Sequence, residues 1–176
     1  LIQDHKFLDA FVVLLSSVVA HARCLKDRIP GCQFLALITG TENTYFERSL
    51  DKLGVSSEQS AAVPSAPPTV KFCELMQSVA SEGTLGEMLA VIVVCEWSYL
   101  SWGERVLSKT NRDDFATYEW VDLHSGDYFA SVVEYLRTLL DKEGGLVDQD
   151  GKDKCKARFL EAVKCEEDFF NHVYEE

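Results

Sequence analysis

The longest apolar segment of the chain, Leu85 to Glu104, predicts a buried helix. It opens with a capping box, in which Thr84 and Glu87 stand where they can satisfy free backbone amides. Apolar or sulfur-bearing residues then follow without a break from Met88 to Cys95. Because nearly all faces of this helix are apolar, we expect it to lie in the core of a helical bundle.

The rest of the chain repeats helical spacing and contains no long alternating strand pattern. We expect a break at Pro30-Gly31 and a loop over residues 55–69, which are rich in Ser, Ala and Pro. The pattern predicts an all-α fold, a single-domain bundle of about seven or eight helices over residues 1–176. The expected helices cover approximately residues 1–23, 32–53, 70–80, 85–104, 113–124, 128–140 and 152–174.

Acidic residues on apolar helical faces are the first indication of a site. Asp4 lies within the stripe of the first helix, either as a residue of the N-terminal turn or as a buried functional carboxylate. Glu96 directly follows Cys95 in the central helix, where an unpaired carboxylate is costly. In contrast, Glu42 and Glu47 are expected to face solvent or to pair with nearby basic residues.

The last helix adds a third candidate acid. Glu166 and Glu167 both lie close to its apolar stripe, and periodicity slightly favours Glu167 as the buried one. A buried acid has a raised pKa, which suits general acid–base chemistry, and a buried thiol beside a base can act as a nucleophile. The stripe consists of Phe159, Leu160, Val163, Phe170, Val173 and Tyr174.

Composition narrows the classes of partner. The formal net charge is −12, and its excess lies beyond Gly54, which argues against nucleic acid and anionic membranes as partners. No apolar run approaches the roughly 20 residues that span a bilayer. The six cysteines show no CxxC spacing, so we expect neither a metal site nor a disulfide framework, and reduced thiols indicate a cytoplasmic protein.

Four short motifs, in order, resemble the TenA family of thiaminase II-type aminopyrimidine aminohydrolases. They extend over essentially the whole chain, although the family's first helical segment has no counterpart before Leu1. The resemblance implies a heme-oxygenase-like helical fold, a homo-oligomer that is a tetramer, and no cofactor or metal. The motifs are Gln3-Asp4 with Phe7-Leu8, then Val94-Cys95-Glu96-Trp97 with Tyr99 and Gly103-Glu104, then Tyr118, Trp120 and Gly126-Asp127-x-Phe129, and finally Glu166-x-x-Phe169-Phe170.

The resemblance also implies roles for individual residues. Asp4 corresponds to the acid that hydrogen-bonds the aminopyrimidine, Cys95 to the nucleophile, and Tyr99 to the tyrosine near the thiol. The E-x-x-F-[FW] context selects Glu166, rather than Glu167, as the acid that transfers a proton. The implied reaction is hydrolysis of 4-amino-5-aminomethyl-2-methylpyrimidine to the hydroxymethyl pyrimidine and ammonia in thiamine salvage.

Several positions depart from the family pattern. Phe7 and Phe72 stand where tyrosines often line the ring, and His124 replaces another pocket tyrosine. Some family members lack the cysteine and carry a glutamate near this point, whereas this chain has both Cys95 and Glu96. We therefore expect these residues to bind the substrate and to decide which aminopyrimidine is used.

Two other functions compete with hydrolysis. The altered aromatic residues favour a non-catalytic protein that binds or senses a pyrimidine on the same scaffold. A metal-dependent oxidase would be expected to carry Glu-x-x-His pairs, and none of the four histidines has an acid three residues before it.

Overall fold

The computed structural model describes residues 1–175, which form an all-α bundle with no strand among them. This confirms the fold class expected from the sequence. The elements are α1 (Ile2–His21), α2 (Leu25–Leu37), the π-helical turn η1 (Ile38–Glu42), α3 (Asn43–Lys52), α4 (Ser57–Ala62), α5 (Pro67–Glu82), α6 (Leu85–Leu107), α7 (Phe115–Leu123), α8 (Gly126–Gly144) and α9 (Gln149–Glu175).

Helix α6 is the centre of the bundle and packs against α1, α5, α7, α8 and α9. The expected capping box is present: the Glu87 amide donates to Thr84 Oγ1 at 3.3 Å, and the Thr84 amide donates to Glu87 Oε2 at 3.0 Å. By length and composition alone α6 could cross a membrane, but 67% of its most apolar window is buried inside the bundle. A central core helix has the same composition.

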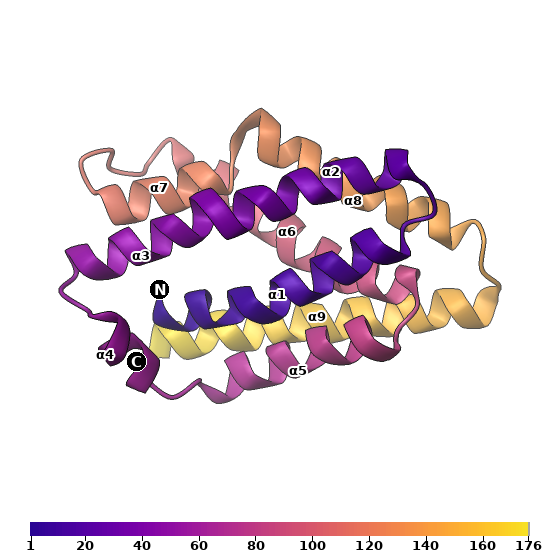
Figure 1. Cartoon of the computed structure of the whole chain (residues 1–176), viewed down its shortest axis with the longest axis horizontal. Coiled ribbons are helices and arrows are strands. Elements are labelled where there is room, and N and C mark those ends of the chain that lie inside the picture. The colour runs from indigo at the N-terminus through magenta and orange to yellow at the C-terminus, as the bar shows by residue number, and fades with distance from the viewer. Residues whose placement is uncertain (176) are drawn as a thin grey trace.

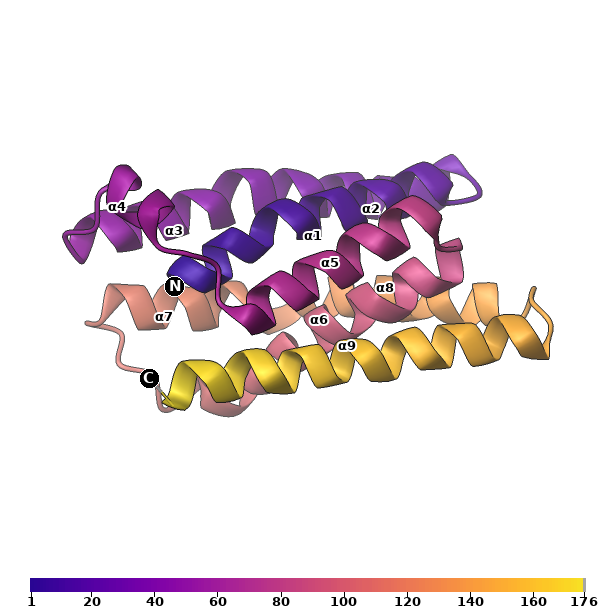
Figure 2. The same cartoon turned by 90° about the horizontal axis from the view of Figure 1, so that it is seen from below.

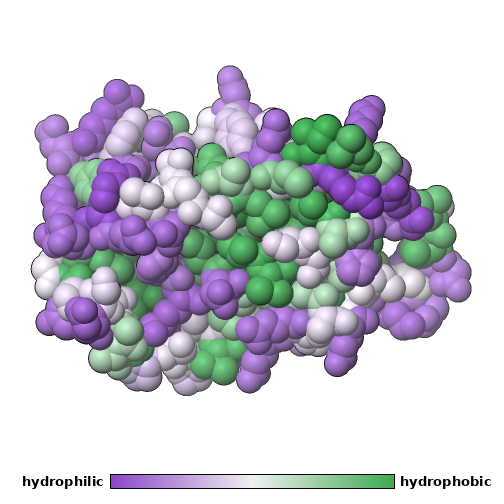
Figure 3. Space-filling view, viewed as in Figure 1, coloured by the Kyte–Doolittle hydropathy of each residue, from purple (hydrophilic) through white to green (hydrophobic). Residues whose placement is uncertain are grey.

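The other helices surround α6. Helix α1 packs against α2 and α5, and α9 packs against α5 and α6 (Figures 1 and 2). Both chain ends lie at the end of the bundle that carries α4 and α7 (Figure 1). On the face shown in Figure 3, apolar surface is concentrated in the middle, with hydrophilic residues around the edges.

The expected break at Pro30-Gly31 is wrong, because both residues lie inside α2. The chain instead turns at Ala22, whose backbone is extended (φ −56°, ψ 141°). Proline costs the helix one backbone hydrogen bond at most positions, and packing on α1 offsets that loss. A Cβ atom at Gly31 would lie 2.6 Å from Val19 Cγ2, so glycine is needed for this close approach.

The expected helix over residues 32–53 is divided by η1 into the end of α2 and α3. The expected loop contains a short helix, α4, because Ser56 and Gln59 form a second capping box. Tyr45 and Phe46 are each 1% exposed and belong to the core rather than to the surface.

The stripe predicted for the last helix is also wrong. Leu160, Val163 and Val173 are 57%, 43% and 51% exposed, whereas the buried face of α9 is shifted by one position. Its buried residues are Ala162, Cys165, Glu166 and Phe169. Glu166 is therefore the buried acid, and Glu167 is exposed and pairs with Lys164.

Candidate active site

A small inner cavity lies between α1, the α2–η1 segment, α6 and the end of α7. It leaves only about 20 Å³ for the centres of water molecules, so it is very small. Six of the eight predicted site residues line it: Asp4, Phe7, Cys95, Glu96, Tyr99 and His124. The other two, Phe72 and Glu166, are buried next to it.

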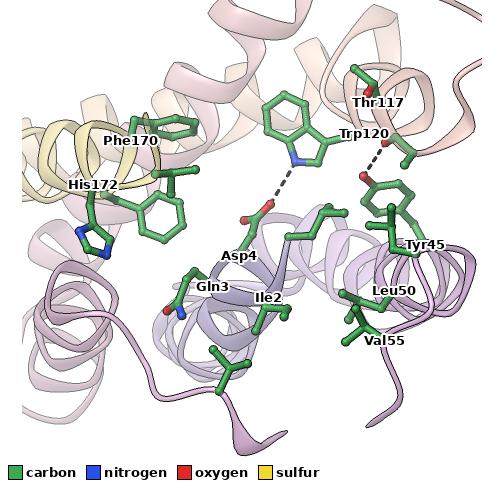
Figure 4. Close-up of a pocket in the computed structure, with 16 residues that line it drawn as sticks. Ile2, Gln3, Asp4, Tyr45, Leu50, Val55, Thr117, Trp120, Phe170 and His172 are labelled. Atoms are coloured by element: carbon green, nitrogen blue, oxygen red, sulfur yellow. Dashed lines mark hydrogen bonds between the residues drawn. The ribbon is translucent and has the colours of Figure 1, made fainter. Parts of the chain in front are cut away.

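Asp4 lies in the first turn of α1, one of the two positions expected for it, and it is half-buried beside the inner cavity. The Trp120 indole donates to Asp4 Oδ2 at 3.1 Å (Figure 4). The Tyr99 hydroxyl donates to Asp4 Oδ1 at 3.5 Å. Burial raises the pKa of Asp4, while these hydrogen bonds act in the opposite direction. Asp4 is thus a carboxyl group held in a fixed orientation by two donors.

Cys95 and Tyr99 stand one turn apart on the same face of α6. The Cys95 thiol donates to the Val91 carbonyl at 3.4 Å. Burial, and then the charge of Glu166, raise the pKa of Cys95 well above its usual value. The empty site therefore holds a neutral thiol, which must lose its proton when it reacts.

Glu166 on α9 is 3% exposed, and neither of its carboxyl oxygens has a hydrogen-bond partner within residues 1–175. Burial and the charge of Asp4 raise its pKa well above the usual value, and the nearby Cys95 thiol partly opposes this. A buried carboxyl with a raised pKa beside a thiol is suited to general acid–base chemistry.

Glu96 is 8% exposed and lines the inner cavity. Burial raises its pKa well above the usual value, and the charges of Glu42 and Glu166 add to this effect. The expectation that Glu42 faces solvent is wrong: its side chain is 13% exposed, lines the same cavity, and has a pKa raised to about 8 by burial. The π-helical turn that ends at Glu42 carries it inward.

His124 follows the last residue of α7, and its two ring nitrogens face Trp120 and Glu42. Its Nδ1 lies 2.7 Å from the Trp120 carbonyl, which assigns the ring proton to Nδ1. Its Nε2 faces Glu42 Oε1 at 3.9 Å. Burial lowers the pKa of His124 to about 4, so the ring is neutral near pH 7. A Cβ atom at Gly103 would lie 2.2 Å from the His124 carbonyl oxygen, so glycine permits this contact.

Aromatic rings close the cavity on its α1 and α5 sides. Phe7 meets Phe72 edge-on with ring centroids 4.9 Å apart, and Phe72 is 1% exposed. Tyr99 packs against both Trp120 and His124, with ring centroids 5.5 and 5.0 Å away. These rings can enclose a flat ligand only after some side chains move, because the empty cavity is too small for a pyrimidine.

A larger open cleft of about 630 Å³ lies on the other side of Asp4. Its walls are mostly apolar and include Tyr45, Phe169 and Phe170, and Trp120 reaches across it to Asp4 (Figure 4). Asp4 lines both spaces and so lies at the boundary between the cleft and the inner cavity. Within residues 1–175, no group of three or more His, Cys, Asp or Glu side chains is arranged to hold a metal ion.

Comparison with known proteins identifies the family. The model of the TENA/THI-4/PQQC family matches residues 1–176. The chain belongs to this family. It is 29% identical over 175 residues to an aminopyrimidine aminohydrolase of Halalkalibacterium halodurans, covering 99% of this chain and 78% of the relative. It is 23% identical to an aminopyrimidine aminohydrolase of Bacillus subtilis, covering 98% and 73% of the two chains.

Solved structures share the family fold. A TenA homologue from Pyrococcus furiosus superimposes with a TM-score of 0.85 at 19% identity, over 97% of this chain and 79% of the other. A TenA family transcription regulator from Silicibacter sp. TM1040 gives a TM-score of 0.83 at 18% identity, over 97% and 78% of the two chains. At these identities the similarity concerns the fold alone.

Proposed function

We propose that this protein is an aminopyrimidine aminohydrolase of thiamine salvage. The reaction is hydrolysis of 4-amino-5-aminomethyl-2-methylpyrimidine to the hydroxymethyl pyrimidine and ammonia. The observation that carries the proposal is one small inner cavity in which Asp4, Cys95 and Tyr99 meet, with the unpartnered carboxyl of Glu166 buried beside it. The two curated relatives are named for this activity.

In the proposed mechanism, Asp4 orients the aminopyrimidine and Cys95 supplies the nucleophile. A new bond forms between the Cys95 sulfur and a carbon of the ring, and the thiol proton passes to an acceptor in the site. The addition breaks the aromaticity of the ring and so helps to expel the group on the exocyclic methylene. Water then adds at the methylene, and the thiol leaves with its proton restored.

Glu166 acts as the acid and base in this mechanism. Its carboxyl gives a proton to the ring as the Cys95 sulfur adds, the ammonium substituent leaves as ammonia, and the resulting carboxylate takes a proton from the attacking water. Atoms balance as one water consumed and one ammonia released. Tyr99 contributes by holding Asp4 and by bordering the thiol.

Ammonia release from the aminomethyl pyrimidine tests the proposal, with Cys95→Ala beside the unchanged protein. Cys73 provides a matched control, because it is a half-buried thiol on α5 that does not line the inner cavity. We expect Cys95→Ala to lose at least about 1,000-fold in kcat and Cys73→Ala to retain activity. Undiminished turnover by Cys95→Ala would contradict the role of the thiol.

A second candidate is a protein that binds a pyrimidine without converting it. Two features favour it: phenyl rings at Phe7 and Phe72 remove hydroxyl groups from the site, and one solved neighbour is described as a transcription regulator. Saturable binding of the pyrimidine with no ammonia release would support this candidate over hydrolysis.

Assembly into a homo-oligomer, a tetramer by the family resemblance, is part of the proposal. Support comes from apolar side chains that remain exposed on α6 and α9, among them Trp97, Leu160 and Val163. Light scattering on the purified protein measures its mass directly, and a mass of about 20 kDa, that of one chain, would refute assembly.

A further inference from the structure

Two acids of the inner cavity have no role in the proposed chemistry. Glu96 is 8% exposed and lines the cavity, yet no donor or cation within residues 1–175 pairs with it. Glu42 lines the same cavity, and its nearest possible partner is the neutral ring of His124 at 3.9 Å. Asp4 differs from both, because each of its oxygens already accepts a hydrogen bond.

The backbone carries Glu42 to this position by an irregular turn. The segment Ile38–Glu42 is a π-helical turn, and both of its end residues line the cavity. Such turns are rare and are frequently found at functional sites. Glu42 therefore reaches the cavity from the α2–α3 side, while Glu96 reaches it from α6.

The cavity offers no positive charge to either acid. No lysine or arginine lines it, and its only histidine is neutral and turns an unprotonated Nε2 toward Glu42. An unpaired carboxylate is expensive in such surroundings, and burial raises the pKa of both acids, that of Glu42 to about 8. A ligand that carries its own positive charge would allow them to ionise and form an ion pair.

We propose that Glu42 and Glu96 form a subsite for a positively charged nitrogen on the 5-methylene substituent of the pyrimidine. The proposal deepens the proposed function and rests on it. It selects the aminomethyl compound, an ammonium ion near pH 7, and thiamine, which carries a thiazolium. It disfavours the formylated amine and the hydroxymethyl product, which are uncharged.

This selection also separates substrate from product. Hydrolysis releases the charged nitrogen of the substrate as ammonia and leaves a hydroxyl group in its place. The hydroxymethyl product therefore no longer pairs with Glu42 or Glu96. The acids then return to their protonated forms, and the product is held less tightly than the substrate.

Calorimetric titration of four ligands tests the subsite: the aminomethyl, formylaminomethyl and hydroxymethyl pyrimidines, and thiamine. The protein carries Cys95→Ala so that the aminomethyl compound stays intact, and Glu42→Gln is compared in that background. Glu47→Gln is the matched control, since Glu47 is an exposed acid five residues along the chain.

We expect the aminomethyl compound to bind at least about tenfold more tightly than the two uncharged ligands. Glu42→Gln should weaken binding of the cation by about tenfold and change that of the uncharged ligands by less than about twofold. Glu47→Gln should change neither. Thiamine separates the sources of charge: if it follows the aminomethyl compound, any cation suffices, and if it does not bind, the subsite requires an ammonium ion.

Two results would overturn the inference. One is equal affinity for the aminomethyl and hydroxymethyl compounds before any change at Glu42. The other is a loss in Glu42→Gln that is the same for charged and uncharged ligands. If Glu42→Gln does not fold, as judged by circular dichroism, Glu96→Gln and Glu42→Asp are compared in the same way, with Glu42→Asp retaining part of the preference.

Ammonia release by the unchanged protein keeps this inference distinct from the proposed hydrolysis. Charge selection without ammonia release would support the subsite and contradict the hydrolase. Ammonia release without charge selection would support the hydrolase and contradict the subsite. If Cys95→Ala itself releases ammonia, the ratio of kcat/KM for the aminomethyl and formylaminomethyl compounds replaces the ratio of affinities.

Discussion

Two buried glutamates on neighbouring parts of the chain, Glu143 on α8 and Glu166 on α9, have almost the same exposure and very different surroundings. Glu143 near the end of α8 is 5% exposed, and Arg23 binds both of its oxygens, at 2.7 and 2.8 Å. Glu166 on α9 is 3% exposed, and its oxygens have no partner within residues 1–175. The α1–α2 connection that holds Arg23 lies at the end of the bundle away from the two chain ends (Figure 1).

The difference separates an acid that stabilises the fold from an acid kept for chemistry. The arginine fork pairs with both oxygens of Glu143 and so ties the start of α2 to α8. Glu166 receives no such compensation and is held in its protonated form, which lowers stability. Sites of this kind are expected to exchange stability for reactivity.

The largest expected effect is on Glu166. We expect Glu166→Gln to lower kcat for ammonia release by about 100- to 10,000-fold, because the amide cannot transfer a proton. The same change should raise the free energy of unfolding at pH 8 by about 1 kcal/mol, since a neutral group replaces an acid that folding forces to stay protonated. Steady-state kinetics and urea denaturation measure the two effects on one sample.

The test depends on kcat falling while the free energy of unfolding rises in the same variant. A variant that loses both activity and stability would show that Glu166 is structural, like Glu143, and the contrast between the two acids would fail.

The next largest effect is on stability and concerns Glu143. Arg23→Ala leaves Glu143 buried without a cation, and we expect the free energy of unfolding to fall, though by less than when a fully buried pair is broken, because Arg23 itself is half-exposed. The kcat/KM of the folded protein should not change. Lys26→Ala, an exposed cation in the same region, is the control and should cost less than about 0.5 kcal/mol.

A smaller effect should appear in the pH dependence of stability. Burial raises the pKa of Glu42 to about 8, so its contribution to stability is complete at low pH and is lost as the pH rises through about 8. His124, with a pKa lowered to about 4, costs stability only when the pH falls below about 6.5. Asp4, Glu96 and His124 are the titratable groups around Glu42.

Urea denaturation between pH 6.5 and 8.5 therefore isolates the acids. We expect the free energy of unfolding to fall by about 2 kcal/mol across this range, and Glu42→Gln to reduce that slope. An identical slope in the variant would show that Glu42 does not titrate in the cavity.

The sequence was sufficient for the fold and for the helices that carry most of the candidate site residues, because these depend on local signals. The capping box at Thr84 and the apolar run after it specify α6, and Cys95 and Tyr99 follow from its period of 3.6 residues. Asp4 and His124 come from other elements. Their arrival beside Tyr99 depends on packing between helices, which no local pattern describes.

The position of Glu42 in the sequence indicated burial, although its residue type suggested that it faces solvent. It lies four residues after Ile38 and four before Phe46, each 1% exposed, so it occupies a position on the buried stripe. A polar residue in an amphipathic segment is usually solvent-facing, and the pairing with nearby basic residues offered a simpler account. Position on the stripe was the better guide than residue type.

The predicted buried face of α9 was wrong because residue type, rather than position, was misleading there. The smallest predicted effect concerns Glu167 on this helix. Its exposed apolar residues moved the expected stripe toward Val163, which favoured Glu167, while the true buried face runs through Ala162 and Cys165. Because Glu167 is exposed and pairs only with Lys164 on the surface, Glu167→Gln should change kcat by less than about twofold and stability by less than about 0.5 kcal/mol. Glu166→Gln and Glu167→Gln differ by one position in the chain, so measuring them together separates the two faces of the helix. A loss of activity in Glu167→Gln comparable to that in Glu166→Gln would mean that α9 rotates when substrate binds, and the comparison of buried acids would then have to be made on a different face.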